Sequence, residues 1–326
     1  MLKKVRKMDE KIKVSVIVAT YNQEKYIGHT LESVVSQNVD FKYEVLVGED
    51  CSTDSTSRIV KEYASKYPDI IFPFFREKNL GMYANLPELF THACGEYIAI
   101  IEGDDYWIDE KKLQKQVDFL DSHKDYVACF GQSIVVDEND VIHPEREEYM
   151  PYIKEKRDYT IKDFEKYIFP GQTATAMYRK SGYEMLQKKI IQSKIDPRNM
   201  VDVAQVLCMM SVGKMYNLGE KVAAYRYVTA KDSGTWSSQN DYYGVKPIID
   251  YLDGMNNLEQ IASKLGLELD FDDRRSYELN KLYDNMGTFS KEDTYKIRHK
   301  IKEDYNTKQK YYKVRLKHFF KGVKRT

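Results

Sequence analysis

Polar and acidic residues follow three apolar segments of the chain, each at the point where the segment ends. The three groups are Thr20-Tyr21-Asn22, Glu49-Asp50 and Glu102-Gly103-Asp104-Asp105. Two carboxylates that stand one or two residues apart can hold a divalent cation, and such a cation can bridge the phosphates of a nucleotide. A single acidic turn is explained as well by the preference of Asp and Gly for surface turns. Two such turns after neighbouring strands favour a ligand site.

The segments that precede these groups are predicted strands of one sheet. They are rich in β-branched residues, and the stretches between them have apolar residues at helical spacing. The predicted strands are Lys13–Thr20, Tyr43–Gly48, Ile70–Phe75 and Tyr97–Ile101. Pro73 predicts that the third of them is an edge or bulged strand. The alternation predicts a mostly parallel sheet with helices on both faces, which binds ligands at the carboxyl ends of its strands.

The rest of the chain is predicted to contain first a mixed region of helices and short strands and then a region of helices only. Residues 126–235 mix helices with short strands, predicted over 127–130, 134–136, 173–178 and 221–227. From about residue 241 onward no segment has a strand pattern, and apolar residues at helical spacing predict helices only. We therefore expect an α/β domain over residues 1–235 and a helical C-terminal region over 236–326.

Composition excludes several classes of protein. The chain has 326 residues with 51 Lys+Arg and 51 Asp+Glu, so it has no chain-wide positive field for nucleic acid. Its four cysteines form no CxxC pair, which argues against a disulfide framework and a cysteine zinc site. The N-terminal MLKKVRKMDEKIK lacks the apolar core of a secretory signal, and no apolar run approaches ~18 residues. These features predict a cytoplasmic protein.

Four motifs in order and at matching spacing resemble the glycosyltransferase family 2 pattern. They are SVIVATYNQEKYIGHTLESVVSQ, VGEDCSTDST, NLG at 79–81 and GEYIAIIEGDDYW. The resemblance is strong over residues 13–125 and continues weakly to about residue 235, through TATAMYRKS, VDVAQVLCMMSVGKM and AAYRYV. It implies a GT-A, Rossmann-like fold with a nucleotide-sugar half (13–125) and an acceptor half (126–235). It also implies a nucleotide-sugar donor, a divalent cation (Mn²⁺ or Mg²⁺) and an inverting single displacement.

The resemblance also implies roles for individual residues. Thr20 and Tyr21 match the loop that lies against the nucleoside, and Asp50 matches the carboxylate that bonds the base, usually uracil. Asp104 is expected to reach the ribose or a metal-bound water. Asp105 is expected to be the main metal ligand, with Asp104 beside it.

The sequence departs from the commonest family pattern at three places. Glu49 stands for an Asp, Cys51 for a Gly, and Glu102-Gly103 for Asp-Ser. The first change keeps the charge. Cys51 is expected to alter its turn, because a residue with a side chain tolerates positive φ poorly.

The general base must be a carboxylate or His within reach of the acceptor hydroxyl. By the resemblance it is an acid that opens a helix in the second half, which Asp202 matches, with Asp196 in reserve. An acid at the start of a helix is also explained by the helix dipole alone, without a catalytic role.

Two further residues have more than one interpretation. Arg226 is interpreted either as a phosphate contact or as part of a structural salt bridge. Trp107 either lies beside the metal site, lines the acceptor groove, or is a half-buried core residue.

The C-terminal tail is basic. After Asp304 no acid occurs, and eight basic residues alternate with apolar ones: Lys308, Lys310, Lys313, Arg315, Lys317, Lys321, Lys324 and Arg325. Such a basic amphipathic segment predicts binding to an anionic membrane surface, here the inner face of the membrane. The alternative is a helix packed on its own domain.

The favoured function is transfer of one sugar, hexosyl or N-acetylhexosaminyl, from a UDP-sugar to a glycan or lipid-linked saccharide. The family's processive synthases carry a QxxRW motif and membrane helices, whereas Trp occurs here only at 107 and 236, neither after Arg. The alternative is a catalytically idle nucleotide-sugar-binding module in a larger glycan-assembly complex. A nicotinamide oxidoreductase would need GxGxxG after the first strand, and a nucleotidyltransferase a Gly-rich basic loop; both are missing.

Overall fold

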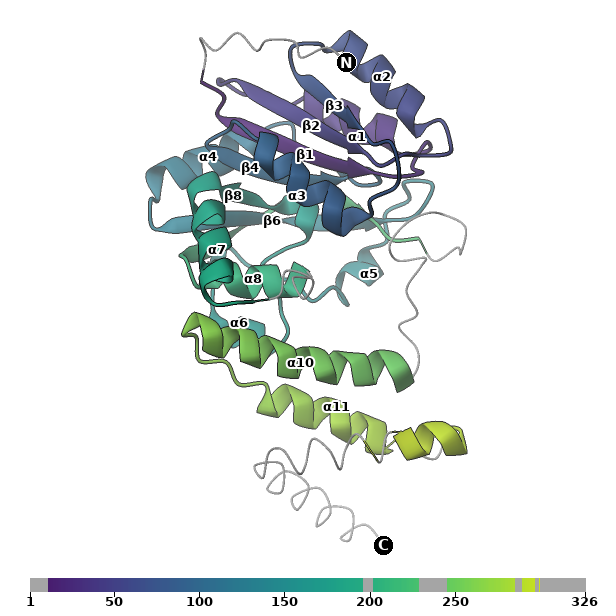
Figure 1. Ribbon diagram of the computed structural model, residues 1–326, viewed down its shortest axis with the longest axis vertical. Helices are drawn as coiled ribbons and strands as arrows, with labels where there is room; N and C mark the ends of the chain where they lie inside the picture. The colour runs from purple at the N-terminus through teal and green to yellow at the C-terminus, as the bar shows by residue number, and fades with distance from the viewer. Residues whose placement is uncertain (1–10, 196–201, 229–244, 285–288, 297–298, 300–326) are drawn as a thin grey trace, which may run out of the picture. The chain divides into compact units, whose positions relative to one another are not determined.

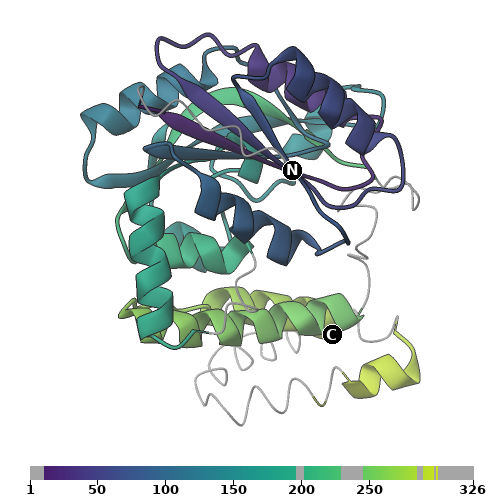
Figure 2. The same cartoon turned by 45° about the horizontal axis from the view of Figure 1, so that its top comes forward.

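A computed structural model describes residues 11–195, 202–228, 245–284, 289–296 and 299 (Figures 1 and 2). The chain divides into two compact units, residues 1–160 with 168–240 and residues 161–167 with 241–326. The basic tail, Asp196 and Trp236 lie outside the described residues. Among the described helices, none reaches the length and hydropathy of a bilayer-spanning segment.

The first half of the first unit is a parallel sheet. Its strands, in the order β3-β2-β1-β4, are Ile71–Phe75, Tyr43–Glu49, Val14–Thr20 and Tyr97–Glu102. Neighbouring strands pair in parallel throughout. β3 carries Pro73 and stands at the edge of the sheet, which confirms the edge-strand prediction, because proline has no N–H for a second neighbour.

Helices cover both faces of these strands. The helices are α1 (Ile27–Val35), α2 (Thr56–Lys66) and α3 (Met82–His92). Ile27 and Leu31 of α1 share a buried cluster with Val47 of β2. The next residue, Gly48, points to the opposite face, where an added Cβ would meet Asn85 and Leu89 of α3. Figure 1 shows α3 across that face.

The second half of the sheet is mixed. Its strands are β5 (Tyr106–Trp107), β6 (Tyr126–Val136), β7 (Arg157–Tyr159), β8 (Met177–Arg179) and β9 (Lys214–Arg226). β8 pairs antiparallel with β4 and β6, while β6 and β9 run in parallel and β5 and β7 pair antiparallel with β9. The helices here are α4 (Lys112–Ser122), α5 (Pro144–Glu147), α7 (Lys180–Gln192) and α8 (Asp202–Met210), with the 3₁₀ turn η1 (Thr173–Thr175). The predicted α/β fold, parallel through its N-terminal strands, is confirmed.

Two predictions about this half were wrong. Residues 173–178 were expected to be one strand, but residues 173–175 form the 3₁₀ turn η1 and the strand β8 begins only at Met177. Residues 127–130 and 134–136 were expected to be separate strands, but both belong to β6. The register against β9 shifts after Phe130, where β6 advances two residues to Gln132 while β9 advances four, from Asn217 to Lys221. The extra residues lie in β9, so β6 continues where the sequence suggests a break.

The described part of the second unit is helical. It contains α6 (Ile161–Glu165), α10 (Val245–Leu265) and α11 (Asp272–Asp284). Phe164 of α6 and Phe271 before α11 have ring centroids 5.8 Å apart, and the rings of Tyr167 and Tyr251 are 4.5 Å apart. The short segment 161–167 therefore packs with the C-terminal helices.

Candidate functional site

The three polar groups lie together at the carboxyl ends of adjacent strands. Thr20 at the end of β1 is in register with Glu49 at the end of β2, and Ala19 is in register with Glu102 at the end of β4. The loops after these strands therefore begin side by side, as the sequence predicts.

Hydrogen bonds connect the loop after β1 to the loop after β2. The Asp50 N–H donates to the Thr20 carbonyl at 3.1 Å, and the Thr53 N–H donates to the Asn22 side chain at 2.8 Å. Asn22 has a φ of 50°, a left-handed conformation that Asn tolerates better than most residues. Tyr21, between Thr20 and Asn22, is 41% exposed.

The Asp50 carboxylate, although buried, binds the NLG motif. Its Oδ1 accepts from the Leu80 N–H and its Oδ2 from the Gly81 N–H, both at 2.8 Å. Gly81 has a φ of 76°, which explains why this motif ends in glycine. A carboxylate oxygen has two lone pairs, so Asp50 keeps acceptor capacity for a further donor such as a base N–H.

Cys51 has a left-handed backbone, with φ of 63°. The turn after Asp50 thus keeps the conformation that glycine would adopt freely, and Cys51 adopts it with a side chain attached. Its thiol contacts the Glu77 carbonyl at 3.7 Å.

Asp105 has both carboxylate oxygens engaged within the protein. Oδ1 accepts from the Arg226 N–H and Oδ2 from the Gln172 side-chain amide, both at 2.8 Å. Asp105 is 2% exposed and Asp104 is 8% exposed. Of the two, Asp104 therefore has the carboxylate that is less committed to protein partners.

The electrostatics of this acidic pair suit a cation. Burial raises the pKa of Asp104 to about 6, against the opposing effects of its own backbone N–H and the Arg226 charge. Burial also raises the pKa of Asp105 well above its usual range, and the charges of Asp104 and Glu102 add to that shift. Two adjacent buried carboxyl groups disfavour their own ionisation, and a divalent cation beside Asp104 would offset this cost. The residues present thus fit a cation held mainly through Asp104.

Arg226 is buried and its guanidinium is satisfied inside the protein. Nε donates to the Asp104 carbonyl at 2.9 Å, Nη1 donates to the Asp137 carbonyl, and Nη2 donates to Asp140 Oδ1, the last two at 2.6 Å. The guanidinium also lies 4.3 Å from the ring centroid of Tyr26. Of its two interpretations, these contacts favour the structural one.

Trp107 is a core residue. Its indole N–H donates to the Ala174 carbonyl of η1 at 2.8 Å, and the ammonium group of Lys112 lies 4.3 Å from the indole centroid. Lys112 is buried, and its Nζ donates to Gln116 Oε1 at 2.7 Å. Desolvation lowers the pKa of this amine to about 7. The core interpretation of Trp107 is thus favoured.

Asp202 is the first residue of α8, as expected for the base, while Asp196 lies outside the described residues. Sequence reasoning missed Gln172, whose side-chain amide donates to Asp105, and Gln23, whose Oε1 accepts from the Thr20 hydroxyl. Gln23 stands inside the YNQE motif and was overlooked there; no pattern marks Gln172.

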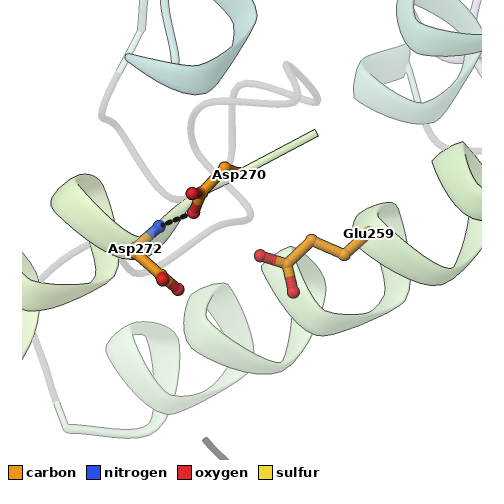
Figure 3. Close-up of side chains that lie close together, drawn as sticks. All are labelled: Glu259, Asp270 and Asp272. Atoms are coloured by element: carbon orange, nitrogen blue, oxygen red, sulfur yellow. Dashed lines mark hydrogen bonds between the residues drawn. The ribbon is translucent and has the colours of Figure 1, made fainter. Parts of the chain in front are cut away.

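A second acidic cluster lies in the second unit (Figure 3). Carboxylate oxygens of Glu259, Asp270 and Asp272 are within 4.8 Å of one another. The buried Arg275 contacts two of them, with nitrogens 3.0 Å from Glu259 and 3.4 Å from Asp272. Its guanidinium supplies the compensating charge, so we interpret this cluster as structural.

Comparison with known sequences identifies relatives of the first unit. A model of the family described as Glycosyl transferase family 2 matches residues 15–186, more than half of the chain. A Mycobacterium tuberculosis protein described as uncharacterized is 37% identical over 215 residues, which are 65% of this chain and 58% of that protein. The poly(ribitol-phosphate) beta-N-acetylglucosaminyltransferase TarS of Staphylococcus aureus is 38% identical over 116 residues, 34% of this chain and 19% of TarS. The chain thus spans less than two thirds of the mycobacterial relative.

Solved structures share the fold. TarS 1–349 in complex with UDP-GlcNAc matches with a TM-score of 0.56 at 23% identity, covering 86% of this chain and 74% of the other. Mannosyltransferase PcManGT from Pyrobaculum calidifontis, in complex with GDP-Man and Mn²⁺, matches with a TM-score of 0.55 at 16% identity, covering 93% and 83%. At these identities the likeness concerns the fold.

Proposed function

This chain belongs to glycosyltransferase family 2, and we propose that it transfers one sugar from a UDP-sugar to a glycan or lipid-linked saccharide. The reaction inverts the anomeric centre and requires Mn²⁺ or Mg²⁺. The observation that carries this proposal is the convergence of Thr20, Asp50 and Asp104 at the carboxyl ends of β1, β2 and β4. In open α/β sheets that edge is where ligands bind.

The nucleoside is assigned to the loops after β1 and β2. Thr20 and the exposed Tyr21 would lie against it, and Asp50 would accept from a base N–H. The Leu80 and Gly81 N–H groups orient the Asp50 carboxylate. Uracil offers such an N–H, which supports UDP as the nucleotide.

The cation is assigned to Asp104. When bound, it would neutralise the charge of the leaving diphosphate. The two hydrogen bonds on Asp105 favour Asp104 over Asp105 as the protein ligand, which reverses the order expected from the sequence. Asp105 instead connects the loop after β4 to β9 and η1. A site with one carboxylate, substrate phosphates and waters is common for Mg²⁺.

The general base is assigned to Asp202. The acceptor oxygen forms its bond to the anomeric carbon as the bond to the nucleotide breaks, and its proton passes to the Asp202 carboxylate. We expect Asp202→Asn to lose transfer by roughly 10²–10⁴-fold, the usual effect of removing a general base. Donor affinity, measured by calorimetry, should stay nearly unchanged, because the base acts on the acceptor. A loss of only about two-fold would point to another acid, with Asp196 as the first to examine.

Membrane association is assigned to the basic tail on its sequence alone. Each basic residue near an anionic surface contributes about 1 kcal/mol. We expect the full chain to co-sediment with vesicles containing anionic lipid and release with salt, and a truncation after Tyr305 to remain in the supernatant. Failure of the full chain to bind such vesicles would contradict a peripheral location.

A further inference from the structure

The hydroxyl group of Thr30 contacts the turn that carries the acidic pair. Thr30 belongs to α1 and is fully buried. Its Oγ1 lies 2.9 Å from the Gly103 carbonyl oxygen and 2.7 Å from the Asp105 carbonyl oxygen. A hydroxyl group has one proton to donate, so these two acceptors share it. Asp104 is the residue between them, and one side chain of α1 therefore holds the backbone on either side of Asp104.

The Thr30 hydroxyl is directed to this turn and not to its own helix. A threonine inside a helix can donate to the carbonyl of the residue four positions earlier. For Thr30 that residue is Tyr26, whose carbonyl oxygen is 3.4 Å from Oγ1, farther than either carbonyl of the turn. The shorter hydrogen bonds thus connect two elements that are more than 70 residues apart in the sequence.

Two further polar side chains, one on α1 and one just after it, hold the backbone that follows the acidic pair. Ser33 Oγ accepts from the Trp107 N–H at 3.1 Å. The Gln37 amide donates to the Asp109 carbonyl at 2.9 Å, and its Oε1 accepts from the Leu113 N–H at 3.0 Å. Successive side chains of this segment thus contact successive parts of the loop after β4, and the threonine is the one that contacts the acidic turn.

We propose that Thr30 is a positioning residue of the donor site, whose hydroxyl fixes the turn 103–105 and thereby the place of the Asp104 carboxylate. The inference rests on the proposed function. The Asp104 carbonyl accepts from Arg226 Nε at 2.9 Å, so donors from α1 and β9 hold three successive carbonyls of this buried turn. Without the hydroxyl, two buried carbonyl oxygens lose this donor, and the turn must move to regain hydrogen bonds. Asp104 would move with it.

The first test measures UDP binding by calorimetry for the full chain, in Mn²⁺ and in EDTA. The Kd in EDTA divided by the Kd in Mn²⁺ isolates the part of binding that depends on the cation, and so on Asp104. Thr30→Val keeps the shape of the side chain without the hydroxyl, and we expect it to reduce this ratio roughly tenfold or more. Thr30→Ser restores the hydroxyl and should keep the wild-type ratio. Thr30→Cys, whose thiol is a weaker donor, should fall between them.

The matched control is Gln37→Met, which removes the hydrogen-bonding groups of another buried side chain of this segment. Gln37 contacts the chain only beyond β5, at Asp109 and Leu113. The pairing of β5 with β9 holds the backbone between these contacts and the acidic pair. The control should lower thermal stability and leave the Mn²⁺ ratio unchanged. A merely structural Thr30 would give this same result in Thr30→Val.

Amide hydrogen exchange adds a readout that does not depend on the cation. The Gly103 N–H donates to the Ala19 carbonyl at 3.0 Å and the Asp105 N–H to the Glu102 carbonyl at 3.2 Å. Their exchange rates therefore report how firmly the turn is held. In EDTA we expect Thr30→Val to accelerate this exchange roughly tenfold or more, whereas Thr30→Ser should leave it near that of the wild type.

The two measurements separate failure of this proposal from failure of the proposed function. An unchanged Mn²⁺ ratio or unchanged exchange in Thr30→Val would overturn the proposal while leaving the function intact, as would equal losses in Thr30→Val and Thr30→Ser. Absence of any Mn²⁺-dependent UDP binding by the wild-type chain would instead contradict the proposed function. The exchange rates would then still decide whether Thr30 fixes the turn.

Discussion

The backbone N–H of Arg226 donates to Asp105 Oδ1 at 2.8 Å, which joins the end of β9 to the loop after β4. The Arg226 guanidinium donates to the Asp104 carbonyl, so hydrogen bonds from one residue hold both members of the acidic pair. Gln172 donates to the second Asp105 oxygen. The conformation of the acidic loop is therefore determined by residues far along the chain.

Removing the Arg226 side chain should destabilise the protein. Arg226→Met leaves the Asp104 and Asp137 carbonyls without their guanidinium donors, and an unsatisfied buried acceptor costs about 1–3 kcal/mol. We expect the free energy of unfolding in urea to fall by about 2–4 kcal/mol. Arg58→Met is the control, because its pair with Glu62 is exposed and should contribute less than about 1 kcal/mol. Equal effects of the two substitutions would refute a structural role for Arg226.

Replacing Cys51 by glycine should stabilise the protein. A left-handed backbone costs a residue with a side chain about 1–2 kcal/mol, which glycine avoids, and the greater entropy of glycine in the unfolded chain offsets part of this. We expect Cys51→Gly to raise the unfolding free energy by about 0.5–1 kcal/mol. Cys94 has no positive φ, so Cys94→Gly should have the opposite sign. A loss of stability at both positions would show that the Cys51 turn is not strained.

Stability should depend on pH through Asp104. Its folded pKa of about 6 lies above the ordinary value of 3.8, so the folded state binds the extra proton between these pH values and loses stability as pH rises through them. Asp104→Asn removes this dependence. In EDTA it should raise the unfolding free energy at pH 7.5 by about 1.4 kcal/mol for each unit of pKa shift removed, with little effect at pH 4. Destabilisation at pH 7.5 would contradict the burial cost assigned to this carboxylate.

Asp50 should determine the choice of base. UDP should bind more tightly than CDP. Cytosine lacks the ring N–H from which Asp50 would accept a hydrogen bond, so the buried Asp50 carboxylate is left without that partner. Asp50→Ala should reduce the UDP-to-CDP affinity ratio in calorimetry by roughly tenfold. Equal affinities of the wild-type chain for the two nucleotides would refute this assignment.

Local sequence patterns were sufficient to predict the strands and loops that form the site. Strand and helix periodicity predicts which loops share the edge of the sheet, and Pro73 predicts the edge strand, because both signals act within a few residues. The partners of Asp105 could not be predicted, since Gln172 and Arg226 are 67 and 121 residues away and meet it only through the order of β4, β8, β6 and β9.

The central claim is cation-dependent release of a nucleotide from a nucleotide-sugar. The most direct measurement incubates the full chain with UDP-, GDP- and dTDP-sugars and quantifies nucleoside diphosphate release in Mn²⁺ and in EDTA. We expect release of UDP in Mn²⁺, with a fall of at least about tenfold in EDTA and in Asp104→Asn. Undiminished release in EDTA, or no release from any donor, would contradict the claim.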